Sequence, residues 1–138
     1  MILLMMLLNM PVAEANPQGN WEYYKKIYQD KHMPMPKDAT LRLHYDFHAD
    51  GTSRLYWWNE GENDRCEREG KYTFAEGVIT EEATVIHPDN HATCSSDPDM
   101  QEGKVSNIPY AIEGEDLHLT LPLGDETLIY VWKRSAET

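Results

Sequence analysis

The stretch LRLHYDFHADGTSRLYWW, residues 41–58, decides the fold of this chain. Apolar residues stand at every second position from Leu41 to Phe47, with polar residues between them. This period of two places the apolar side chains on one face of a β-strand. The Ala49-Asp50-Gly51 segment that follows is typical of a turn, and a second apolar and aromatic run returns from it. The stretch therefore predicts an antiparallel β-hairpin.

The rest of the chain after residue 58 repeats this rhythm of short strands and turns. A count of seven or eight strands, joined by turns without intervening helices, predicts an all-β, antiparallel up-and-down barrel of about eight strands. Residues 21–32 fit either a helical face or a strand, and residues 88–107 form a long polar loop. The further strands are expected at residues 65–74, 78–87, 108–112, 117–123 and 127–134.

The chain begins with eight apolar residues, MILLMMLL. Small residues at Ala13 and Ala15 match the pattern of a signal-peptide cleavage site, and the run is too short to span a bilayer. We therefore expect a cleaved signal peptide over residues 1–15, a barrel domain over residues 16–138, and a secreted or periplasmic location. The alternative is an N-terminal helix that belongs to the folded domain.

The chain has two cysteines, Cys66 and Cys94. An even number of cysteines in a small exported domain predicts a disulfide, which would tie down the long polar loop. The alternative is a pair of free, buried thiols.

The charge of the chain argues against one class of partner. A formal net charge of −12 disfavours binding to nucleic acid. No nucleophile elbow, phosphate-binding loop, dinucleotide fingerprint or zinc-protease motif is present, so neither an enzyme nor a cofactor is expected.

Two short motifs at the ends of the predicted barrel resemble the lipocalins and the wider calycin group. Gly19-Asn20-Trp21 resembles their first signature, and Arg134 (or Lys133) stands where they place a basic residue over that tryptophan. The segment from Leu43 to Trp57 also resembles a hairpin of small bacterial lipocalin-like domains. The resemblance covers residues 19–134 and implies a barrel whose base is closed by Gly19, Trp21 and Arg134.

Aromatic residues are spread over several of the predicted strands. Because neighbouring residues of a strand face opposite sides, one of Trp57 and Trp58 must point away from the interior. The aromatic residues predict a pocket for an apolar or planar ligand, and the alternative is an ordinary hydrophobic core. The ligand-binding candidates are Tyr45, Phe47, Trp57, Trp58, Tyr72 and Tyr130.

No metal site is expected. His44 and His48 lie four positions apart on one strand, too far along it to share an ion, while His87, His91 and His118 show no zinc spacing. The acidic residues of the long loop, Asp97, Asp99 and Glu102, lack the glycine that a calcium loop needs.

The leading functional hypothesis is non-catalytic binding of a small hydrophobic or amphipathic molecule, without a membrane span. The alternative is a protein-interaction or inhibitor module with a solid interior, which would use the 88–107 loop and the exposed tryptophan.

Overall fold

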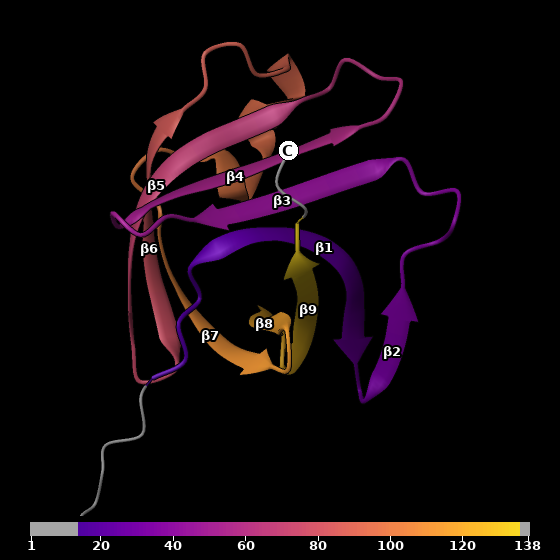
Figure 1. Cartoon of the computed structure of the whole chain (residues 1–138). Helices are drawn as coiled ribbons and strands as arrows, with labels where there is room; N and C mark the ends of the chain where they lie inside the picture. Colours follow the sequence, from indigo (N-terminus) through magenta and orange to yellow (C-terminus); the bar gives the residue numbers. More distant parts are fainter. Residues whose placement is uncertain (1–13, 136–138) are drawn as a thin grey trace, which may run out of the picture.

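A computed structural model describes residues 14–135. These residues form nine strands and two short 3-10 helices (Figure 1). The elements are β1 (Gly19–Tyr28), β2 (Lys31–Pro34), β3 (Leu41–Phe47), β4 (Thr52–Asn59), β5 (Cys66–Ala75), β6 (Val78–Ile86), η1 (Ala92–Ser96), η2 (Pro98–Met100), β7 (Val105–Glu113), β8 (Asp116–Leu123) and β9 (Glu126–Arg134).

The strands make one antiparallel sheet that closes on itself. Its order is β2-β1-β3-β4-β5-β6-β7-β8-β9, and pairing of β1 with β9 completes an eight-stranded barrel, with β2 as an additional strand. Figure 1 shows β1 and β9, the first and last strands of the barrel, side by side. The all-β up-and-down barrel predicted from the sequence is thus confirmed. Closure gives the barrel strands a partner on both sides along part of their length.

The N-terminal segment whose structure was left open is a strand. β1 bends at an irregularity between Tyr23 and Lys25, so that its first half pairs with β3 and its second half with β2. Gln29 and Asp30, both with positive φ, form the two-residue turn into β2. Two successive residues with positive φ form a turn whose twist matches that of the two antiparallel strands it joins.

The hairpin predicted from residues 41–58 is present. β3 and β4 pair from Leu41 with Asn59 to Phe47 with Ser53. Gly51 in the connecting turn has a φ of 87°, a conformation that glycine adopts without strain.

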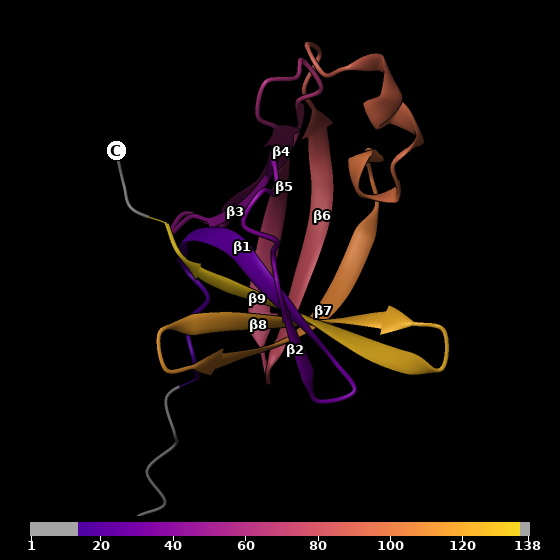
Figure 2. The same ribbon diagram turned by 90° about the vertical axis from the view of Figure 1, so that its right-hand side faces the viewer.

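The long loop after β6 is more ordered than its polar composition predicts. It contains η1 and η2 and returns to the sheet at Val105, three residues before the strand that the sequence indicates. The Cys66–Cys94 disulfide, which is present as predicted, fastens η1 to the start of β5. In Figure 2 the loop lies at one end of the barrel, beside β6 and β7.

Trp21 seals the opposite end. Its side chain is fully buried, and its indole Nε1 donates to the Pro17 carbonyl at 2.8 Å. The Arg134 guanidinium lies 4.4 Å from the indole centre and donates to the Gln18 carbonyl at 3.3 Å. Gly19, with a φ of 145°, passes beneath that guanidinium where a Cβ atom would lie 2.5 Å from Arg134 Nη1.

The predicted signal peptide lies almost wholly outside the described residues, since the description begins at residue 14. Among residues 14–135, no helix is long and apolar enough to cross a membrane.

Candidate functional site

The barrel interior contains a cavity of about 540 Å³. The cavity occupies the half of the barrel opposite Trp21, and its wall is mainly apolar and aromatic. Drug-sized ligands bind in cavities of this volume range. The lining comes from β3, β4, β5, β6, β7, β8, β9 and the long loop: Leu41, Leu43, Tyr45, Leu55, Trp57, Arg68, Glu81, Asp97, Asp99, Lys104, Ser106, Asn107, Ile108, Leu119, Thr120, Leu121, Pro122, Tyr130 and Trp132.

The exposed lining residues Asn107 and Pro122 place the mouth of the cavity where β7 and β8 separate. Their ladder runs only from Tyr110–Leu119 to Glu113–Asp116 within the described chain. Beyond it, the start of β7 and the end of β8 diverge, as Figure 2 shows, and Asn107 and Pro122 line the cavity there. The cavity is therefore reached from the side of the barrel, beneath the long loop.

Three of the six aromatic ligand-binding candidates line this cavity: Tyr45, Trp57 and Tyr130. Phe47 and Tyr72 lie deeper, in the closed half. Their rings contact each other at 5.0 Å, and the Tyr72 hydroxyl donates to the His48 carbonyl at 2.6 Å. The structure thus places these two among the packed core residues around Trp21.

Trp58 lies on the outer face of β4, opposite to Trp57. There it forms an outer aromatic ladder with His44 and Tyr56, whose parallel rings have centroids 5.0–5.9 Å apart. Arg65 lies over both the Tyr56 and the Trp58 rings. Burial lowers the pKa of His44, which keeps its ring neutral near pH 7.

A closed network of polar groups forms one wall of the cavity. Arg68 and Glu81 are 5% and 2% exposed, and their side chains make a bidentate ion pair with N–O distances of 2.8 and 3.2 Å. The Tyr45 hydroxyl donates to Glu81 Oε1 and accepts from Arg68. The Ser53 hydroxyl donates to Glu81 Oε2 at 2.5 Å, so both carboxylate oxygens accept two hydrogen bonds.

The network also connects the cavity wall to the long loop. Arg68 Nε donates to the Asp99 carbonyl of η2 at 2.8 Å. Burial, with the charge of Glu81 next in effect, holds the pKa of Tyr45 well above its ordinary value. Tyr45 therefore stays a neutral donor across the physiological pH range.

Trp132 contributes a polar atom of a different kind. The residue is 2% exposed and lines the cavity beside Tyr45. Its indole Nε1 is buried and has no hydrogen-bond partner among residues 14–135. Buried donors are usually paired, so this unpaired N–H is an exception within the described chain.

Sequence reasoning missed Arg68, Glu81 and Trp132 as site residues. Strand alternation puts Arg68 on the same face as Cys66 and Tyr72, and a charged residue at such a position was the available signal. Its partner Glu81 lies on another strand, and the pairing depends on a register that the sequence alone does not define.

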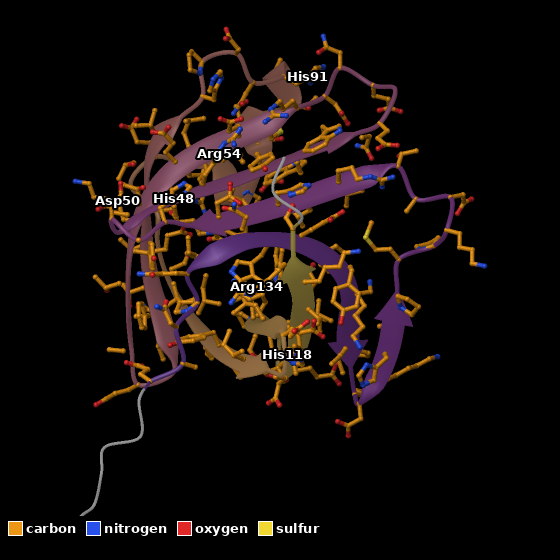
Figure 3. All side chains as sticks on the ribbon, viewed as in Figure 1. His48, Asp50, Arg54, His91, His118 and Arg134 are labelled. Atoms are coloured by element: carbon orange, nitrogen blue, oxygen red, sulfur yellow. A yellow bond between two sulfur atoms is a disulfide. The ribbon has the colours of Figure 1, made fainter. Side chains whose placement is uncertain are left out.

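The histidines and the loop carboxylates do not form a cluster in the described residues. In the described part of the chain, no three His, Cys, Asp or Glu side chains lie close enough to hold a metal ion. Figure 3 shows His48, His91 and His118 in three separate regions of the molecule. Asp97 instead caps η2, accepting from the Asp99 backbone N–H at 2.8 Å.

Comparisons with known proteins support the fold. No protein-family model and no curated protein matches the sequence. Among solved structures, the chain is similar to a lipocalin-like protein from Bacteroides uniformis, with a TM-score of 0.55 and 14% sequence identity. The match covers 86% of this chain and 97% of that one. At this identity the similarity shows the fold alone, and it confirms that the barrel is lipocalin-like.

Proposed function

We propose that this lipocalin-like barrel is a non-catalytic binding protein that holds a small, mainly apolar molecule in its interior. The observation that supports the proposal most strongly is the cavity of about 540 Å³ lined by Tyr45, Trp57 and Tyr130. A barrel of eight strands has room either for packed side chains or for one small ligand. Here the side chains that pack around Trp21 leave a cavity in the rest of the interior.

The cavity also weighs against the alternative of an interaction module, which requires a solid interior. The long loop, on which that alternative depends, supplies Asp97, Asp99 and Lys104 to the wall of the cavity. The loop therefore has a place in the interior site. A secreted or periplasmic location is part of the same proposal, because the Cys66–Cys94 disulfide is compatible with an oxidising compartment.

The proposal is tested by titrating the disulfide-bonded protein with N-phenyl-1-naphthylamine, an uncharged dye that fluoresces in apolar surroundings. Wild type should show saturable fluorescence at one dye per chain. Leu121→Trp adds bulk to a half-buried lining residue near the mouth and should abolish most of the signal.

The matched control is Val85→Trp, which adds the same indole at an exposed position outside the cavity. Circular dichroism checks that both variants fold. Absence of saturable binding to wild type, or equal binding to a folded Leu121→Trp variant, would contradict the proposal.

A further inference from the structure

We infer that the ligand of this cavity is an uncharged molecule and not an anionic amphiphile such as a fatty acid. This inference rests on the proposed function, which it narrows to a chemical class. It follows from the state of every charged group in the cavity wall.

The buried charges in the wall already neutralise each other. Arg68 is the only cation among the buried lining residues, and its guanidinium binds both oxygens of Glu81. Its remaining contacts go to the Tyr45 hydroxyl and the Asp99 carbonyl. A ligand carboxylate would therefore enter without a free counter-charge, and burial of an unpaired charge is strongly unfavourable.

The same network disfavours a buried cation. Each oxygen of Glu81 accepts two hydrogen bonds, from Arg68 and Tyr45 or from Arg68 and Ser53. A ligand ammonium would have to displace one of these donors.

The mouth adds a second barrier to anions. Asp97, Asp99 and Lys104 line the cavity at its solvent-exposed side, and Lys104 Nζ already lies 3.5 Å from Asp99 Oδ1. The two carboxylates thus outweigh the one ammonium. The chain as a whole has a formal charge of −12, so the wider field also repels an approaching anion.

Two dyes that share one ring system test the charge argument. N-phenyl-1-naphthylamine is neutral, and 8-anilinonaphthalene-1-sulfonate is the same framework with a sulfonate. Wild type should bind the neutral dye about tenfold more tightly, or better, because the sulfonate has no free cation in the wall. Equal affinities, or tighter binding of the sulfonate, would overturn the inference while leaving the binding function intact. Failure of both dyes would instead count against the function itself.

Two substitutions on β6 test whether the ion pair of Arg68 with Glu81 causes the preference for the neutral dye. Glu81→Gln leaves Arg68 without its counter-charge and should shift the affinity ratio toward the sulfonate. Glu82→Gln removes the same charge from an exposed neighbour and should leave the ratio unchanged. An unchanged ratio in folded Glu81→Gln would contradict the inference. If Glu81→Gln does not fold, the ratio of the two dye affinities in wild type alone tests the inference.

Discussion

Trp21 lies where the segment before β1, the end of β9 and the core of the barrel meet. Its indole N–H binds the Pro17 carbonyl, its ring lies under Arg134, and its side chain packs in the same core cluster as Phe47 and Tyr72. The Gly19-x-Trp21 and Arg134 positions therefore act together at the closed end of the barrel. Gly19 is needed there because a larger residue would strain the backbone and push the guanidinium off the ring.

Trp21→Ala should lower the free energy of unfolding by about 3–5 kcal/mol, the usual cost of truncating a fully buried tryptophan. Urea denaturation measures the change. Trp58→Ala is the control, because Trp58 lies on the half-exposed outer face of β4, and its loss should be clearly smaller. A change near zero for Trp21→Ala would contradict the role of the indole in closing the barrel.

Glu67 is the residue whose protonation should affect stability in acid. The hydrogen bond from Arg54, followed by that from Arg65, lowers the pKa of Glu67 to about 2 against the opposing effect of burial. A carboxyl group with a depressed folded pKa stabilises the fold above its unfolded pKa and loses this contribution as pH falls toward the folded pKa.

Wild type should therefore lose more stability between about pH 5 and pH 2 than Glu67→Gln does. Urea unfolding at a series of pH values measures the difference. Glu69→Gln, with an exposed side chain on the same strand, should follow the wild-type curve. Parallel curves for wild type and Glu67→Gln would show that the two ion pairs do not favour the folded state.

Some positions of the site follow from the sequence, and others require the fold. Adjacency on a strand already implies that Trp57 and Trp58 face opposite sides, and the structure shows Trp57 lining the cavity and Trp58 outside. Adjacency does not determine which of the two faces the interior, because that depends on the register of β4 with its neighbouring strands. The ion pair of Arg68 with Glu81 likewise joins two strands and requires the pairing of β5 with β6.

At the scale of elements, local sequence signals predict a β-hairpin better than they predict where two strands separate. The β3–β4 hairpin follows from strict alternation and a glycine turn, which are local features. The divergence of β7 from β8 is not local, because it depends on which residues of the two strands pair and which do not. Phe47 and Tyr72 lie in the closed half although they alternate with polar residues as Tyr45 does. Their depth in the barrel is likewise set by strand pairing and not by the local pattern.

The disulfide holds the element that covers the mouth. Cys66 and Cys94 are 28 positions apart, and Trp57 packs against them from the cavity wall. Replacing both cysteines by serine should lower the free energy of unfolding by about 3 kcal/mol, since the unfolded chain regains the freedom of that loop.

Chemical denaturation of the double variant measures this loss. Alkylation of denatured wild type from an oxidising compartment should label neither cysteine. Labelling of both cysteines, or an unchanged stability of the double variant, would contradict the structural role of the bridge.

At the scale of the whole molecule, the barrel has two unlike halves. Core side chains around Trp21 fill the closed half and hold the strands together. The other half is hollow, with a buried ion pair in its wall, an aromatic lining and a loop fixed by the disulfide. A rigid base with a lined cavity above it is suited to holding a ligand, because the cavity does not have to form on binding.

The four tryptophans allow the central claim to be tested in one spectrum. Trp57 and Trp132 line the cavity, Trp21 lies in the closed end, and Trp58 lies on the outer face. The measurement is the set of ¹⁵N–¹H indole resonances during titration with N-phenyl-1-naphthylamine. We predict that the signals of Trp57 and Trp132 shift with saturation while those of Trp21 and Trp58 stay in place. A shift of Trp58 alone, or no shift of any indole, would contradict an interior ligand site.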